Sequence, residues 1–100
     1  MSTATLICTQ SNQFELSGCV DFENVIDLYH TGCKHIALSP DTVIQIGLQN
    51  LNQSTSACIA LFTAWLRYAG KHGKQIGYHN EPAFLRNMAE VSAVDNILFA

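Results

Sequence analysis

Charged residues are scarce in this chain. Asp, Glu, Lys and Arg make up 13% of its 100 residues, only five residues are Lys or Arg, and the formal net charge is −3. A typical globular domain carries about twice that charged fraction. The few basic residues form no stripe, which argues against nucleic acid or an anionic membrane as the main partner. A surface with so little charge predicts that a partner covers part of it.

Long apolar runs are also missing. No stretch approaches the roughly 18–20 apolar residues that a bilayer-spanning helix needs. The first five residues, Met-Ser-Thr-Ala-Thr, carry no basic residue ahead of the first apolar run, so no signal peptide is predicted. We therefore expect a cytoplasmic protein without direct membrane insertion.

Paired metal-ligand spacing is absent from the four cysteines, Cys8, Cys19, Cys33 and Cys58. No CxxC occurs, and no Cys/His pairs stand at zinc-finger spacing. Each cysteine lies in or beside an apolar segment. We expect reduced cysteines that act as small hydrophobic residues in the cytosol, and neither a metal nor a cofactor.

Hydrophobic residues make up 48% of the chain, enough for one core, and we expect a single domain over residues 1–100. Alternation and β-branched residues predict strands at 5–9, 13–17, 42–48 and 75–79. Apolar residues at helical spacing predict helices from about 21 to 31, from about 56 to 71, and from Glu81-Pro82 onward. The order β-β-α-β-α-β-α predicts an α/β fold. A hairpin and two right-handed crossovers form a four-stranded mixed sheet with helices packed on it.

Several details of the first helix and of the C-terminal region are also predicted. Asp21 is the expected N-cap, and Gly32 is the expected C′ residue that ends the first helix. Residues 34–41 are then expected to form a connection with a short extended piece. Residues 50–53 are expected to form a polar loop, and residues 95–100 a last turn or docking segment. Inward-facing residues are predicted at Phe22, Val25, Ile26 and Tyr29 in the first helix and at Phe84, Leu85, Met88 and Ala89 in the third.

Three consecutive hydroxyls, Ser54, Thr55 and Ser56, stand where a strand leads into the long second helix. Hydroxyls at this position cap free backbone N–H groups, and they lie at the positive end of the helix dipole. Two interpretations are open: capping alone, or capping together with contact to a partner. The candidate partner-binding residues are Ser54, Thr55, Ser56, Ala57, Cys58 and Ile59.

Other side chains of the second helix have structural explanations. Trp65 is expected in the core, with an interface patch shared with Tyr68 as the alternative. Arg67, Lys71 and Lys74 are expected at the negative end of the helix dipole. No Ser–His–acid set, P-loop or glycine-rich phosphate cradle is visible, so the chain is predicted not to be an enzyme.

Three segments resemble the STAS domain, the fold of anti-sigma-factor antagonists and of sulfate-transporter tails. Residues 16–21 (Leu-Ser-Gly-Cys-Val-Asp) resemble the family's L-S-G-E-L-D, and residues 69–76 resemble its A-K-x-x-G-x-x-[VI]. Residues 47–59 are similar to D-L-S-x-V-x-x-V-D-[ST]-[AGS]-G-L. The chain is most similar to the STAS subunits of Mla-type phospholipid ABC transporters.

The resemblance implies a role for Ser56, which takes the place of the family's Ser/Thr. In the sigma-regulating branch a partner kinase phosphorylates this hydroxyl, and in the transporter branch it lies at the contact with the cytosolic ATPase. The chain departs from the motif at three positions. Gly47 and Thr55 replace its two aspartates, and Cys58 replaces its glycine.

Two functions follow as hypotheses. The first is a non-catalytic subunit that binds and regulates the ATPase of an Mla-type transporter, which assembles with a permease and maintains outer-membrane lipid asymmetry. The alternative is an anti-sigma-factor antagonist that a serine kinase switches by phosphorylating Ser56. The missing acid at Thr55 favours the first.

Overall fold

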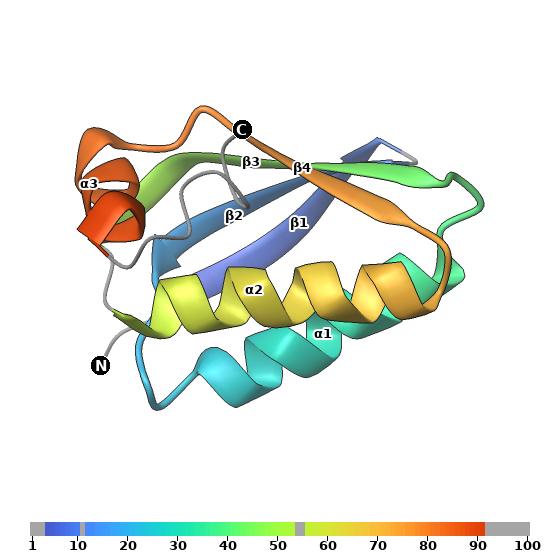
Figure 1. The fold of residues 1–100 in the computed structure, drawn as a ribbon, viewed down its shortest axis with the longest axis horizontal. Helices are drawn as coiled ribbons and strands as arrows, with labels where there is room; N and C mark the ends of the chain where they lie inside the picture. The colour runs from blue at the N-terminus through green and yellow to red at the C-terminus, as the bar shows by residue number, and fades with distance from the viewer. Residues whose placement is uncertain (1–3, 11, 54–55, 92–100) are drawn as a thin grey trace.

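The computed structural model describes residues 4–10, 12–53 and 56–91, which form four strands and three helices (Figure 1). In chain order the elements are β1 (Ala4–Gln10), β2 (Gln13–Cys19), α1 (Val25–Leu38), β3 (Val43–Gln53), α2 (Ser56–Lys71), β4 (Gln75–His79) and α3 (Ala83–Val91).

The four strands form one mixed sheet in the order β1-β2-β3-β4. β1 pairs antiparallel with β2, while β2 pairs parallel with β3 and β3 with β4. Helices α1 and α2 lie side by side along one side of this sheet, and α3 lies at one end of it (Figure 1). The predicted architecture, a hairpin followed by two crossovers, is therefore confirmed.

The core fills the space between the sheet and the helices α1 and α2. Trp65 and Phe62 are its largest fully buried side chains, so the prediction that Trp65 lies in the core is confirmed. The indole Nε1 of Trp65 donates to the carbonyl oxygen of Tyr29 at 3.2 Å, which satisfies the only polar atom of the indole ring. The hydroxyl of Tyr78 donates to the carbonyl oxygen of Phe62 at 2.8 Å, and burial raises the pKa of Tyr78 well above its usual value.

Helix α1 begins later than predicted. The N-cap residue is Asn24, so the prediction of Asp21 at this position is wrong. The Asp21 carboxylate instead accepts the backbone N–H groups of Glu23 at 2.9 Å and Asn24 at 3.0 Å. These bonds form a separate turn, and the shift leaves Phe22 and Ile26 exposed rather than facing inward.

Helix α1 also ends later than predicted, because it passes through Gly32 and continues to Leu38. The glycine is needed there for close packing: a Cβ on Gly32 would lie 2.3 Å from the nearest atoms of the Trp65 indole. The helix ends at Ser39, which is extended and precedes Pro40, a residue that disfavours helical backbone before it. The predicted connection at 34–41 is thus mostly helix.

The end of α1 is held by Lys74, from the turn after α2. Its ammonium donates to the carbonyl oxygens of Ile36 and Ser39, the latter at 2.6 Å. These are carbonyls of the last helical turn, which lack a partner within the helix. Lys74 therefore stabilises the end of α1, not the end of its own helix as predicted.

Strand β3 is longer than predicted, since it continues to Gln53 through the segment expected to be a loop. Its register with β2 shifts between Glu15 and Ser17 and again between Gly18 and Cys19, with an extra β3 residue each time. The first of these bulges lets Leu48 and Leu51 both face the core although they are three positions apart, an odd number that strict alternation would put on opposite faces. The loss of strict alternation made these residues resemble a loop.

The C-terminal half follows the prediction closely. The prediction of α2 at 56–71 and β4 at 75–79 is confirmed. The N–H of Lys74 bonds the carbonyl of Ala69 at 2.8 Å, and Gly73 has φ +69°, as in a Schellman ending.

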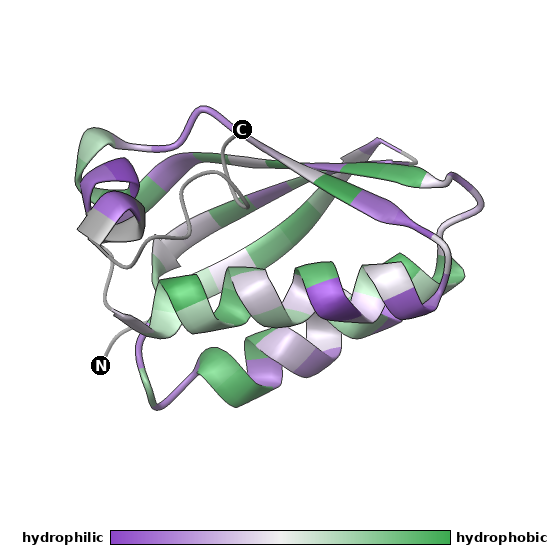
Figure 2. Ribbon diagram, in the orientation of Figure 1, coloured by the Kyte–Doolittle hydropathy of each residue, from purple (hydrophilic) through white to green (hydrophobic). Residues whose placement is uncertain are grey.

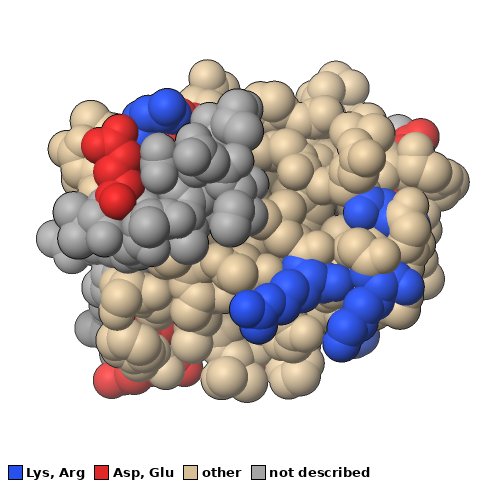
Figure 3. Space-filling view, in the orientation of Figure 1, with Lys and Arg blue, Asp and Glu red and all other residues tan. Residues whose placement is uncertain are grey.

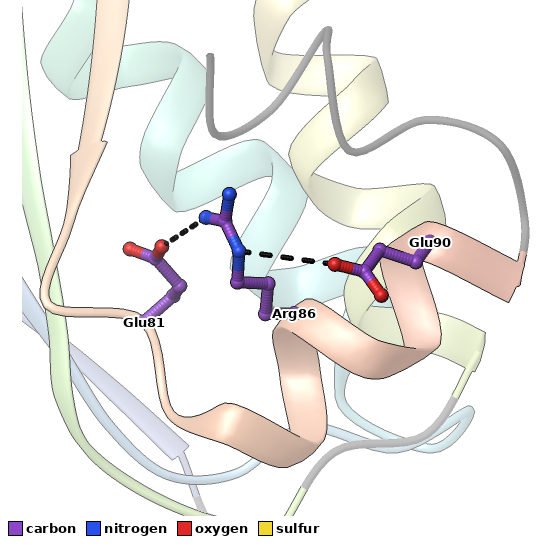
Figure 4. A network of polar contacts seen from close by, with 3 residues as sticks. All are labelled: Glu81, Arg86 and Glu90. Atoms are coloured by element: carbon purple, nitrogen blue, oxygen red, sulfur yellow. Dashed lines mark hydrogen bonds and ion pairs between the residues drawn. The ribbon is translucent and has the colours of Figure 1, made fainter.

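In α3, Leu85 is buried as predicted, but Phe84 is exposed. The side chains of Met88 and Ala89 and the segment 95–100 lie outside the described part of the structure. Arg86 bridges Glu81 at 2.7 Å and Glu90 at 4.0 Å along this helix (Figure 4). Exposed pairs of this kind contribute little, about 0–1 kcal/mol each.

We expect Gly32→Ala to lower the free energy of unfolding by about 1–3 kcal/mol, because the rigid indole would have to move. This loss exceeds the helix-propensity gain, which is at most about 1 kcal/mol. Gly70→Ala in α2 is the matched control, since nothing lies within 4 Å of its added Cβ. Urea denaturation of both variants measures the difference, and an equal or higher stability of Gly32→Ala would contradict it.

We expect Lys74→Met to lower the free energy of unfolding by about 1–2 kcal/mol, because it removes charge-assisted bonds to the end of α1. Lys71→Met removes an exposed cation from the end of α2 and should change stability by at most about 0.5 kcal/mol. Thermal unfolding of the two variants tests this, and equal melting temperatures would mean that the cap contributes nothing.

Candidate partner-binding surface

The N-terminal ends of α1 and α2 lie together at one end of the molecule (Figure 1). They do so because β2 and β3 are parallel, so the C-terminal ends of both strands, from which α1 and α2 follow, lie at the same end of the sheet. The turn at residues 21–24 and the first turn of α2 are therefore neighbours in space.

The structure separates the predicted site residues into exposed and buried ones. Ser56 is the exposed first residue of α2, and Ile59 is half-buried. The side chains of Ala57 and Cys58 are 1% and 0% exposed and belong to the core. Both side chains pack inside the free chain, and their contact with a partner stays a prediction. Ser54 and Thr55 lie outside the described residues.

Beside Ser56 the two helices form an apolar hollow, which we call the helix groove. Its volume is about 270 Å³, and it is lined by Val25, Ile26, Tyr29, Ala60, Leu61 and Ala64. Apolar residues follow one another along both helices here (Figure 2). Because Ser56, Ala60 and Ala64 are four residues apart on α2, they share one face of that helix. The hydroxyl thus stands at the end of an apolar row.

Large apolar side chains stand exposed at the same end of α1. Ile26 is 61% exposed and Phe22 is 71% exposed. Ile26 lines the groove and Phe22 lies four residues before it in the chain, and clustered apolar surfaces mark interaction sites more often than scattered single residues do.

A second hollow of about 690 Å³ continues between the C-terminal halves of the helices, lined by Tyr29, His30, Cys33, Lys34, Ala37, Leu38 and Tyr68. Burial raises the pKa of the Cys33 thiol, although its hydrogen bond with Tyr29 opposes this. The thiol is thus protonated at neutral pH and is a poor nucleophile. Cys33 therefore acts here as a small packing residue.

Charges around the two helices are divided between their ends. Lys34, Arg67 and Lys71 lie toward the C-terminal ends, whereas Glu23 and Asp27 lie at the N-terminal end of α1. Figure 3 shows the basic side chains gathered over the C-terminal part of α2, away from the acidic ones. The apolar surface beside Ser56 is consequently flanked by acids on one side and by bases farther along.

Sequence reasoning missed the exposed residues of α1. It placed Phe22 and Ile26 in the core because both stand at helical spacing with Val25 and Tyr29 in a helix expected to begin at Asp21. Had the helix been extended to Leu38, the buried stripe would have been read as Leu28, Gly32, Cys33 and Ile36, with Phe22 and Ile26 outside it.

Within residues 4–10, 12–53 and 56–91, no three His, Cys, Asp or Glu side chains gather in a way that could hold a metal ion. Of the helices in this part of the chain, none combines the length and the hydropathy that a bilayer crossing requires.

Comparisons with known proteins agree with this architecture. A family model described as "Mlab, STAS domain" matches residues 8–99. A chain of the Acinetobacter MlaFEDB complex in its ATP-bound Vtrans2 conformation has a similar structure, with a TM-score of 0.83 and 20% sequence identity. The match covers 94% of this chain and 96% of that one.

The unphosphorylated form of the anti-sigma factor antagonist SpoIIAA also has a similar structure. Its TM-score is 0.76 at 14% identity, and the match covers 97% of this chain and 86% of that one. No curated protein matches the sequence. The family match spans most of the chain, which therefore belongs to the STAS domain family, in the branch described as Mlab.

Proposed function

We propose that this protein is a non-catalytic STAS subunit of an Mla-type phospholipid ABC transporter, where it binds the cytosolic ATPase. It would reside in the cytoplasm, at the inner membrane only through that partner, and would take part in maintaining outer-membrane lipid asymmetry. The family match and the similarity to a chain of the MlaFEDB complex support this assignment.

The observation that carries the proposal is the exposed apolar surface beside Ser56. Ile26 stands out from α1, Phe22 stands out from the turn before it, and the groove that Ile26 lines is almost wholly apolar. Covering this surface would release apolar area from water at about 25 cal/mol per Å². The STAS hydroxyl lies at its edge, so one partner can contact both the serine and the apolar residues.

Binding alone would stabilise the ATPase, since any ligand of the folded form does so by mass action. Control of its activity requires more. The subunit must bind one ATPase conformation more tightly than another, and the ratio of the two affinities sets the size of the effect.

The similarity to SpoIIAA supports a second candidate, a phospho-switch at Ser56 in a sigma-factor pathway. Ser56 is exposed at a helix N-terminus, where a kinase can reach it and where the helix dipole favours a phosphate. Phosphorylation would add a charge of about −1.5 to −2 next to the apolar groove and would weaken docking there.

We expect Ile26→Asp to weaken binding to the ATPase by about tenfold or more, because it places a charge in the apolar contact. Ile26 is mostly exposed in the free protein, so the fold should be unaffected. Ile7→Asp on β1, which is 49% exposed on another face, is the matched control and should bind normally. Calorimetric titration of each variant into the separately purified ATPase measures the two affinities. An unchanged affinity of Ile26→Asp would mean that the ATPase binds elsewhere on the chain.

We expect Ser56→Arg to abolish partner binding while the circular dichroism spectrum and melting temperature stay close to those of the native protein. The arginine would project from the exposed first residue of α2 into the partner. Purification of the native complex with mass spectrometry separates the two candidates. An ABC ATPase with its permease supports the transporter subunit, whereas a serine kinase with phosphate on Ser56 supports the switch.

A further inference from the structure

Strand β1 lies at an edge of the sheet, and among the described residues no strand pairs with its outer side. Its seven residues, Ala-Thr-Leu-Ile-Cys-Thr-Gln, include no charged residue and no proline. Natural proteins usually place such residues on edge strands to block pairing with another chain. As far as residues 4–10, 12–53 and 56–91 go, this edge is therefore open to a further strand, with Ile7 exposed at its centre.

A groove of about 390 Å³ runs beside this edge, between β1 and α1. Its lining consists of Ala4, Thr5, Leu6, Asn24, Asp27, Leu28 and Thr31. A strand added to β1 would bring its own side chains to the mouth of this groove. The lining includes Leu6 and Leu28, so an apolar side chain of the size of leucine suits it.

The neighbouring face of α1 carries opposite charges on one exposed stripe. Asp27, Thr31 and Lys34 are exposed and follow one another at steps of four and three residues along one side of the helix, where Asp27 and Thr31 line the groove beside β1 and Lys34 also borders the second hollow. Among the described residues, neither Asp27 nor Lys34 takes part in an ion pair. An identical helix running antiparallel would place its lysine opposite this aspartate, and its aspartate opposite this lysine.

The centre of β1 and the centre of the charged stripe on α1 lie at about the same position along the strand direction. β2 runs antiparallel to β1, and α1 runs back along β2, so β1 and α1 run in the same direction (Figure 1). The centre of β1 is Ile7, and the midpoint between Asp27 and Lys34 falls next to Thr31, which lines the same groove as Leu6. One two-fold axis can therefore pass close to both Ile7 and Thr31.

The layer spacings also agree. Neighbouring strands lie about 4.8 Å apart and packed helices about 8–10 Å apart, so one helix covers about two strands. Extending the sheet through two copies of β1 would consequently set two copies of α1 at normal helix-packing distance. One arrangement of the two copies can therefore form the strand pair and the helix pair at the same time.

We propose that two copies of this chain associate through β1 and α1, with antiparallel β1 strands joined into one continuous eight-stranded sheet. Ile7 meets Ile7 of the partner subunit near the axis. Asp27 pairs with Lys34 of the partner subunit, and the converse pair forms on the other side of the axis. A two-fold interface of this kind needs one self-complementary surface, which the uncharged edge and the oppositely charged stripe provide. This surface lies apart from the helix groove, so the proposal does not depend on the ATPase as partner.

Sedimentation velocity of the purified chain over about three decades of concentration tests the association. The apparent mass should rise from 11.0 kDa toward twice that value. Ile7→Lys puts two ammonium groups opposite each other and should weaken association by about tenfold or more. Val43→Lys, also an exposed β-branched residue on a strand but away from β1, should associate like the native chain.

Charge reversal gives the sharper test. Asp27→Lys places two lysines opposite each other and should weaken association, and Lys34→Asp should do the same. The double variant D27K/K34D restores opposite charges and should recover the native behaviour. A chain that stays at 11.0 kDa throughout would overturn the proposal. The proposal would also be overturned if Ile7→Lys associated as strongly as the native chain, or if the double variant did not regain native association.

The two proposals can fail separately. Ile26→Asp should weaken ATPase binding without changing self-association, and Ile7→Lys should weaken self-association without changing ATPase binding. A chain that never associates but captures an extended peptide on β1 would show that the edge is open for a different occupant, and would reject the dimer.

Discussion

The packing of the Trp65 indole into the space that a side chain at Gly32 would need is the constraint on which the helix layer depends. It lets α1 and α2 approach closely at mid-length, because any side chain at Gly32 would overlap the ring. The indole N–H also bonds the carbonyl of Tyr29, one turn earlier in α1. This contact fixes both the spacing and the rotation of α1. With Leu28 and Ile36 turned toward the sheet, Ile26 is left on the outside beside Ala60. The apolar surface next to Ser56 is thus a consequence of how α1 is seated in the core.

The order and type of the elements could be predicted from the sequence, whereas the bounds of α1 and β3 could not. β3, α2 and β4 show strong local periodicity, and local periodicity was enough to find them. The course of α1 depends on Trp65, which is more than thirty residues away in the chain, so nothing local shows that Gly32 continues the helix. The end of α1 has a local signal in Pro40, but the cap that Lys74 supplies from another turn has none. The bulges in β3 depend on pairing with β2 and remain hidden in a single sequence.

The same limit applies to the candidate site. The position of Ser56 at the start of α2 followed from the strand-to-helix pattern, and its exposure agrees with a contact role. The burial of Ala57 and Cys58 follows from the rotation of α2, which its full apolar stripe determines. Gly47, where the STAS motif has an aspartate, lies on the sheet between Glu15 and His79 of the neighbouring strands. Its flanking residues Ile46 and Leu48 are buried, so position 47 faces the side of the sheet opposite the core. The missing acid therefore changes the open face of the sheet, not the helix surface beside Ser56.

The few charged residues of the chain lie outside β1 and the helix groove, the centres of the two surfaces proposed to bind partners. Four of its five basic residues lie in the C-terminal halves of α1 and α2 or just after α2, and one of them, Lys74, caps α1. Both β1 and the helix groove are left without charge of their own. Few charges on these surfaces would repel a wrong partner. The selectivity of each surface must therefore come from its shape and from the charges at its rim. For the helix groove those rims are acidic at the start of α1 and basic toward the end of α2. For the edge of the sheet they are Asp27 and Lys34, whose spacing suits an antiparallel copy of the same helix.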